Sequence, residues 1–434
     1  MKNVRTLLIA SAVAASVVSP MAAAELKVYG KASLSLENAE TKGISSVRYL
    51  TAGDAASRVD TTTLDDKWQV TSHASRFGVK GDNELNDWLK AVYIMEWEID
   101  MADNTNSSAD HIKARNQYVG LKSNSFGEII IGRNDTPVKT AQGKIDLFND
   151  LPGDIKNVME GEQRQNNMIQ YSTPNFLDLV QAKLMLVPGE SGAQGYDDPS
   201  TAAKDCDTLS TPEDECTLSV RDGIADGKSL SVVVEPGNFY IAAAVDMDMP
   251  AKNSGTNFTI KNGGGAAIDY TPNQGFNGYT SAFRFVDTTR LVFMYKVKSF
   301  GGGVLVQSSE LSNTNGNVAA NTITAANPNA RSNPGKEESI MFSGYYKLAF
   351  AKFKGQLIET ENFAGDDIDA TSLSVGVDFQ LGEKTILGVY NTQNEFEHNG
   401  VSIANFDGLG NAYAANAGTV SEVNTFGVNL EHSF

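Results

Sequence analysis

The chain has few cysteines, few histidines and no long apolar run in its body. Two cysteines and four histidines among 434 residues leave little material for a structural metal site or a disulfide framework, so we expect neither a metal nor a cofactor. Lysines and arginines are also in deficit, 35 against 53 acidic residues. This deficit argues against a nucleic-acid partner, because phosphate neutralisation requires clustered basic residues. Beyond the first residues, no segment approaches the roughly 18 apolar residues of a membrane helix.

The first residues have the composition of a secretory signal peptide. Lys2 and Arg5 precede an apolar stretch over residues 7–18, and a small-residue cleavage site ends at Ala24. A membrane-anchor helix is the alternative, but the apolar stretch is short for one. Cleavage after Ala24 removes two basic residues and no acidic ones, so the mature chain carries 33 − 53 = −20 charges.

Apolar and polar residues alternate in several segments, which is typical of a β-strand with one face of each kind. The pattern extends through the last residues of the chain, where Phe426, Val428 and Leu430 alternate with polar neighbours. From 89 to 99 the odd positions are Leu89, Ala91, Tyr93, Met95, Trp97 and Ile99. A soluble β-sandwich produces the same alternation, so periodicity alone leaves both a sandwich and a membrane barrel open.

The spacing of connections favours the barrel. The sequence predicts about sixteen strands of roughly 9–14 residues, the length that a tilted strand needs to cross a bilayer. Short connections, such as those near 83–87 and 382–384, alternate with long ones near 38–66, 137–163 and 188–227. Outer-membrane barrels have short periplasmic turns and long external loops. We therefore predict an all-β, transmembrane antiparallel β-barrel.

Four segments resemble the Gram-negative general diffusion porins: LKVYGKASLSL (26–36), SRFGVKG (75–81), YVGLKSNSFGEIIIGRNDTP (118–137) and GVNLEHSF (427–434). The resemblance implies a signal peptide (1–24) and one porin domain (25–434). It also implies a homotrimer in the outer membrane of a Gram-negative bacterium, in contact with lipid and lipopolysaccharide. Phe434 matches the terminal residue that such porins present to the barrel assembly machinery. The expected function is passive diffusion of ions and small hydrophilic solutes, without an enzymatic step.

The resemblance further implies a pore constriction with basic residues on the barrel wall. By motif, these residues are Lys31, Arg76, Arg115 and Arg133, and Arg164 is a further candidate. Lys31 and Arg76 also pass a parity test, because each alternates with apolar neighbours. Each of the five could instead be a solvated surface charge.

In such porins the third loop folds into the lumen and carries acidic residues opposite the basic wall. Here the third loop is 137–163, and Asp146, Asp150 and Asp154 are the predicted constriction acids. The alternative is that these aspartates are turn and cap residues, a common role in loops. Opposed charges across a narrow lumen would orient dipolar solutes and disfavour apolar ones.

Cys206 and Cys216 lie in the fourth long loop, and an oxidising compartment predicts a disulfide between them. The net charge predicts a mild preference for cations. Two other functions on the same barrel stay open: a substrate-specific channel and an outer-membrane adhesin. An outer-membrane hydrolase has no supporting nucleophile arrangement in the sequence.

Overall fold

The computed structural model describes residues 25–48, 58–102, 112–189, 223–250, 258–261, 267–270, 285–312, 336–363, 368–398, 403–406, 411–414 and 420–434. The predicted signal peptide and the predicted Cys206–Cys216 pair lie outside the described residues. Within the described part, no helix is long and apolar enough to cross a membrane.

The described chain is almost entirely strand. Two short helical segments, α2 (Pro137–Ala141) and η1 (Ile155–Asn157), interrupt it. The first strands are β1 (Glu25–Arg48), β2 (Arg58–Ser72), β3 (Arg76–Asn86), β4 (Leu89–Ile99), β5 (Ile112–Ser123), β6 (Gly127–Asp135), β7 (Arg164–Ser172), β8 (Val180–Val187), β9 (Gly227–Val234) and β10 (Phe239–Pro250). The later strands are β13 (Phe285–Lys296), β14 (Phe300–Leu311), β15 (Glu337–Lys347), β16 (Ala351–Glu361), β17 (Ile368–Gly382), β18 (Thr385–His398) and β21 (Val420–Ser433). Small additional strands are β11 (Phe258–Lys261), β12 (Ala267–Tyr270), β19 (Ile403–Phe406) and β20 (Asn411–Ala414).

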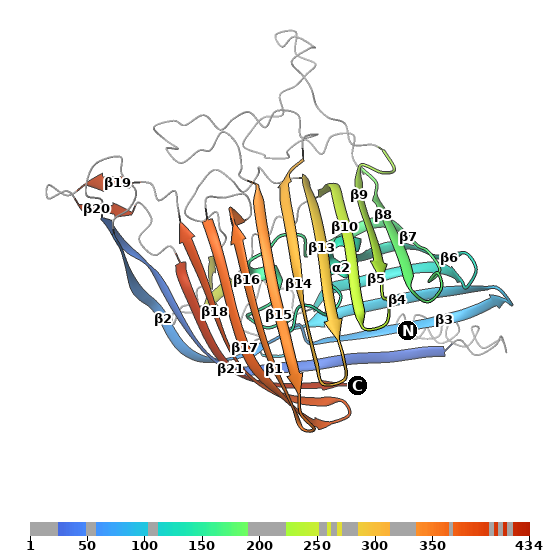
Figure 1. Cartoon of the computed structure of the whole chain (residues 1–434), viewed down its shortest axis with the longest axis horizontal. Coiled ribbons are helices and arrows are strands. Elements are labelled where there is room, and N and C mark those ends of the chain that lie inside the picture. Colours follow the sequence, from blue (N-terminus) through green and yellow to red (C-terminus); the bar gives the residue numbers. More distant parts are fainter. Residues whose placement is uncertain are drawn as a thin grey trace, which may run out of the picture.

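These strands form a closed antiparallel barrel (Figure 1). Neighbours along the chain pair with each other, and β1 pairs with β21 to close the ring. Strands β2 and β3 lie end to end along the same side of β1, separated only by His73, Ala74 and Ser75. Counted as one crossing, they make a sixteen-stranded barrel, and the predicted fold class is confirmed.

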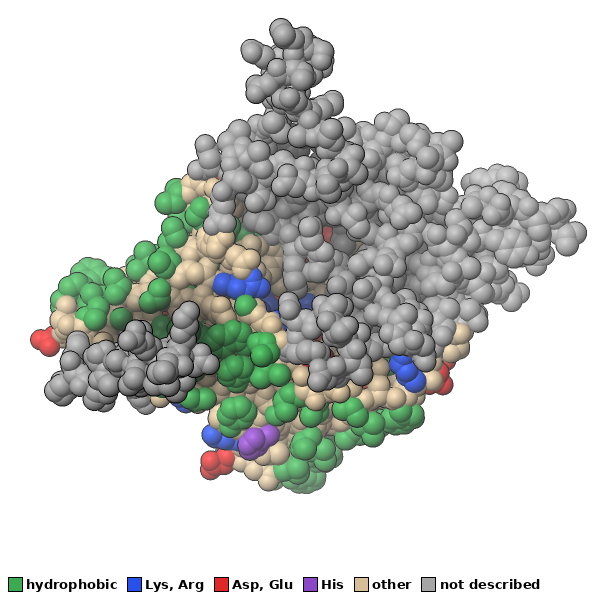
Figure 2. All heavy atoms as spheres, turned by 180° about the vertical axis from the view of Figure 1, so that it is seen from behind, with side chains coloured by type: hydrophobic (Ala, Val, Ile, Leu, Met, Phe, Trp, Pro, Cys, Tyr) green, Lys and Arg blue, Asp and Glu red, His purple; other side chains and the backbone are tan. Residues whose placement is uncertain are grey.

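The barrel surface is apolar outside and polar inside. Outward side chains include Leu26 and Val28, which are 61% and 60% exposed. Figure 2 shows hydrophobic side chains spread over the described outer surface with few charged ones among them. Inward positions are buried and polar, among them Ser33, Ser35 and Ser374. A soluble β-sandwich would bury its apolar face. Here the apolar side chains are exposed and the inward ones are polar, which excludes a sandwich and fits a barrel in lipid.

The main apolar core lies inside the barrel, between residues 137–163 and one part of the inner wall. Val138, Ile145 and Ile155 of this inner segment are fully buried. They belong to one cluster with wall residues that include Tyr240, Ala242, Val292, Met294, Leu305, Met341 and Ile358. The segment therefore has an apolar side held against β10, β13, β14, β15 and β16.

One expected long connection is mostly strand. The sequence predicts a connection over 38–66, but β1 continues to Arg48 and β2 begins at Arg58, and the two pair throughout. This part of the hairpin is rich in Thr, Ser and charged residues. Because neither face is apolar, the period-two signal is absent although the backbone ladder continues.

Candidate functional site

The inner segment begins with a capped helical turn. The Thr136 side chain accepts a hydrogen bond from the Lys139 amide at 3.1 Å, and Pro137 occupies the first turn. Both are favoured at a helix start, because the cap satisfies a free amide and proline has none to satisfy. α2 then contacts β9 and β10, which directs the following residues across the barrel interior.

Asp150 lies where the inner segment approaches the opposite wall. Its Oδ2 accepts hydrogen bonds from Lys31 Nζ at 2.9 Å and from Arg76 Nη2 at 2.6 Å. Burial alone would raise the pKa of Asp150, but the charges of Arg76 and Lys31 outweigh it and hold that pKa below its usual range. The structure thus brings together two predicted basic residues, from β1 and β3, and one predicted acid.

Asp146 and Asp154 make contacts within the inner segment instead. Asp146 accepts hydrogen bonds from the amides of Phe148 at 3.0 Å and Ile155 at 3.3 Å. Asp154 caps η1, accepts a hydrogen bond from the Asp150 amide at 2.7 Å and pairs with Lys156 at 2.9 Å. Burial, with a further contribution from the Asp154 carboxylate, raises the pKa of Asp146 to about 8. Both aspartates thus make the contacts of turn and cap residues.

Arg115 and Arg164 face the interior but bind wall acids. Arg115 donates to Glu96 at 2.7 Å and to Glu98 at 2.6 Å, both on neighbouring β4. Arg164 lies 2.9 Å from Asp135. Within the described chain, neither arginine forms a hydrogen bond or ion pair with the three predicted loop acids.

Arg133 lies at an irregularity of the strand ladder. It follows Ile129 and Ile131, which are exposed on the outer surface, at a spacing of two. The register between β6 and β7 shifts between Gly132 and Asn134, so this alternation does not extend to Arg133. Its guanidinium donates to the Asn166 side chain. Within the described chain it forms no hydrogen bond or ion pair with the three predicted loop acids, and its place on the constriction wall stays a prediction.

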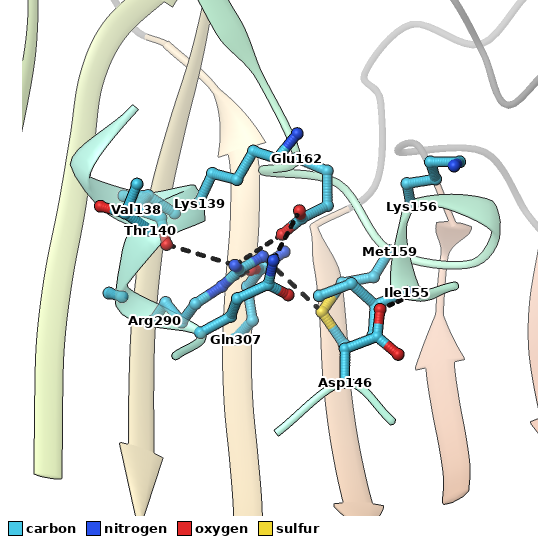
Figure 3. A network of polar contacts seen from close by, with 12 residues as sticks. Val138, Lys139, Thr140, Asp146, Ile155, Lys156, Met159, Glu162, Arg290 and Gln307 are labelled. Carbon is cyan, nitrogen blue, oxygen red and sulfur yellow. Dashed lines mark hydrogen bonds and ion pairs between the residues drawn. The ribbon is translucent and has the colours of Figure 1, made fainter. Parts of the chain in front are cut away.

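Arg290, which the sequence analysis did not select, anchors the inner segment (Figure 3). Its side chain on β13 is completely buried and pairs with Glu162 at 2.7 Å. It also donates to the carbonyl oxygens of Val138 at 3.2 Å and Glu160 at 3.3 Å, and to the Gln307 side chain at 2.7 Å. Arg290 therefore holds both ends of the inner segment. Arg290 has the parity of the buried Val292 and Met294, but Leu291 and Phe293 between them are apolar as well, so the sequence does not mark the inner face of this strand.

A second polar network, also absent from the prediction, joins β1 to β18 across β21. His73 Nε2 lies 2.5 Å from Glu37 Oε1, and the Tyr390 hydroxyl donates to the same oxygen. Tyr390 donates also to Ser35 Oγ at 3.1 Å. These four side chains are buried, and buried polar groups require such partners. The network fixes the wall where β2 passes into β3.

Residues of the inner segment line two cavities formed by the described part of the chain. A cavity of about 310 Å³, here called the loop-side cavity, is lined by Asp150, Arg115 and Lys156 together with Glu37 and His73. A second cavity, of about 590 Å³, is bounded by residues of the short turns, including Asn175, Asp178 and Glu235. We call it the turn-side cavity. The inner segment contributes to both, so it lies between two wider spaces of the barrel.

A closed barrel, an apolar outer surface and an inner segment that carries a buried charge cluster define a channel-forming class of outer-membrane protein. A sequence profile of the Gram-negative porin family matches residues 10–425. The chain belongs to the Gram-negative porin family.

Individual relatives match over part of their length. Outer membrane porin N of Escherichia coli is 27% identical over 193 residues, which cover 44% of this chain and 48% of that protein. Outer membrane porin protein 32 of Delftia acidovorans is 35% identical over 113 residues, which cover 24% of this chain and 31% of that protein. The matched regions thus span less than half the length of these relatives.

Solved structures share the fold over nearly the whole chain. An anion-selective porin from Comamonas acidovorans has a TM-score of 0.59 at 19% identity and covers 95% of this chain and 100% of its own. Salmonella typhi OmpF, in complex with daunomycin, has a TM-score of 0.54 at 13% identity and covers 94% of this chain and 97% of its own.

Proposed function

We propose that the protein is an outer-membrane channel for passive diffusion of ions and small hydrophilic solutes. One observation carries the proposal: Asp150 of the inner segment faces Lys31 and Arg76 of the wall, at 2.9 and 2.6 Å, inside a barrel with an apolar outer surface. Opposed charges there produce a transverse field that favours dipolar and hydrated solutes over apolar ones. Permeation then requires no chemical step.

Within this proposal the predicted residues have different roles. Lys31, Arg76 and Asp150 form the constriction, and Arg115 and Arg164 extend the charged wall beside it. Asp146 and Asp154 support the proposal through the hydrogen bonds that shape the inner segment. Arg133, which donates to Asn166, stays a candidate for the same charged wall.

The proposal includes a mild preference for cations. Lys31, Arg76 and Arg115 each pair with a carboxylate at the constriction, so their charges are largely offset there. The excess of acidic residues over the whole chain then sets the sign of the potential at the entrances. The porin of Comamonas acidovorans is anion-selective, so this fold is compatible with either sign.

Planar-bilayer recording tests both parts of the proposal. Purified protein should conduct in KCl, and a salt gradient should give a reversal potential of cation-selective sign. A reversal potential of anion-selective sign would overturn the preference alone. Conductance that saturates with one solute would identify a substrate-specific channel, and a non-conducting barrel would support an adhesin.

The proposed assembly is a homotrimer in the outer membrane, surrounded by lipid and lipopolysaccharide. Phe434, whose backbone exchanges hydrogen bonds with Gly30 of β1, is the proposed recognition residue for the barrel assembly machinery. Channel closure in three equal steps supports the trimer. Single-step closure of every channel contradicts it.

A further inference from the structure

The turn-side cavity has a surplus of lysine side chains. Lys144 of the inner segment and Lys183 of β8 line it, together with Lys296 of β13. The lining contains two acids, Asp178 and Glu235. Glu235 pairs with Lys296 at 3.4 Å, so only the exposed Asp178 is left to offset the charges of Lys144 and Lys183. Within the described chain, the ammonium groups of Lys144 and Lys183 form no hydrogen bond or ion pair.

The carboxylates that act on Lys183 from a distance are already bound to other cations. They are Glu128 and Asp135. Glu128 pairs with Lys122 at 3.6 Å, and Asp135 lies 2.9 Å from Arg164. Lys183 is half-buried, and a partly desolvated ammonium group without a close counter-ion is unfavourable. An anion from solution would supply the missing charge.

Two further lysines lie around the ring of Tyr345, a residue that lines this cavity. The ammonium groups of Lys347 and Lys352 lie 5.2 Å and 4.9 Å from the ring centroid. These lysines are directly opposite each other on β15 and β16, and like charges in that position destabilise a sheet. Tyr345 and Ser343 add hydroxyl groups to the lining, which can donate hydrogen bonds to an oxyanion.

We propose that the turn-side cavity is a binding subsite for small multivalent anions, above all phosphate-bearing solutes. An ammonium group acts as a compact point charge with three donors, so a group of lysines selects for the charge of an anion more than for its shape. Phosphate carries about two negative charges near neutral pH and several acceptor oxygens. This inference rests on the proposed channel function, because solutes reach the cavity through the lumen.

Single-channel recording with tripolyphosphate tests the subsite. Tripolyphosphate is added to one side of the membrane at a time while KCl carries the current. We expect blocking events from one side, because the cavity lies beside residues of the short turns, at one end of the barrel. In the Lys144→Gln/Lys183→Gln variant the half-blocking concentration should rise about tenfold.

Lys90→Gln is the matched control. Lys90 is a lysine near a short turn that pairs with Asp82 at 3.4 Å and Glu84 at 3.3 Å and does not line the cavity. Its loss should leave the block unchanged. The single Lys144→Gln variant changes only an exposed side chain and keeps the test available if the double variant does not fold. It should weaken the block about threefold.

Two outcomes separate the subsite from the channel function. Normal KCl current with equal block from both sides, or with no effect of the double variant, overturns the subsite and leaves the channel proposal standing. Absence of any KCl current overturns the channel proposal. Titration calorimetry with tripolyphosphate then decides the subsite separately: binding that the double variant loses supports it, and binding that the double variant retains overturns it.

Discussion

Asp150 combines an unusual backbone conformation with a strongly paired side chain. Its φ of 69° lies in the left-handed region, which aspartate tolerates better than most residues because its short side chain can hydrogen-bond locally. The Asp154 carboxylate accepts a hydrogen bond from the Asp150 amide and holds this conformation. The Asp150 carboxylate is thereby directed toward Lys31 and Arg76.

Asp150→Asn should shift ion preference toward anions, because it leaves two wall cations without their shared carboxylate. A unit charge acts on an ion 4 Å away with about 1 kcal/mol in water, which corresponds to roughly a fivefold change in the permeability ratio. Reversal potentials of the two proteins measure this ratio. Asp87→Asn, at an exposed turn outside both cavities, is the control, and an equal shift in both variants would contradict the assignment.

Asp146 should make stability depend on pH. Its pKa is raised from 3.8 to about 8, so the folded protein holds a proton that the unfolded chain has released. The stabilising contribution is complete below about pH 4 and is lost as pH rises through about 8. Asp146→Asn should flatten this dependence, as measured by Tm between about pH 5 and pH 9. An unchanged slope would show that another group is responsible.

At the level of single residues, the sequence identified those that alternation places on the inner face. Lys31 and Arg76 are opposite in parity to apolar residues such as Val28 and Phe77, so parity and motif agree on them. Arg133 stands at a register shift between Gly132 and Asn134, where alternation no longer assigns a face. The choice among Asp146, Asp150 and Asp154 depends on loop geometry, which has no periodic signal in the sequence.

The inner segment is held in place as one element by Arg290. Arg290→Met should destabilise the protein by about 3–5 kcal/mol, because it leaves the buried Glu162 carboxylate without its cation. The segment should also become mobile, which would appear as increased open-channel current noise. Arg290→Met/Glu162→Gln should recover part of the stability.

Lys336→Met is the control for this prediction. Lys336 forms an exposed pair with Glu338 at 3.6 Å, and such pairs contribute about 0–1 kcal/mol. Tm and current noise should stay near those of the unaltered protein. Equal losses in the Arg290 and Lys336 variants would show that the buried pair does not anchor the segment.

Strand limits were predicted well where one face of a strand meets lipid and the other meets water, because apolar and polar residues then alternate. The expected strand over 89–99 has the same limits as β4. The extension of β1 and β2 between residues 38 and 66 was missed, because strand pairing there is satisfied by the backbone alone. A backbone hydrogen-bond ladder without an apolar face leaves no pattern in the side chains.

For the whole molecule, the seam between β1 and β21 that closes the barrel ends in a contact between Gly30 and Phe434. Their backbones exchange hydrogen bonds of 3.2 and 3.0 Å. A Cβ added at Gly30 would overlap the Phe434 ring and lie 2.6 Å from the Arg76 carbonyl oxygen. Gly30→Ala should therefore weaken the seam, and the folded band on a cold SDS gel should convert at a lower temperature. Gly382→Ala is the matched control, since nothing lies within 4 Å of its added Cβ.

The β1–β21 seam also constrains the order of folding. Ser33 and Asn429, which hydrogen-bond across it, are 396 positions apart in the chain. One edge of β1 therefore stays unpaired until nearly all later strands have formed, and an unpaired edge invites association with other chains. The entropic cost of joining distant ends grows only slowly with length, so the hazard is the long exposure of that edge. A nascent chain of this protein needs its first strand shielded until the last one arrives.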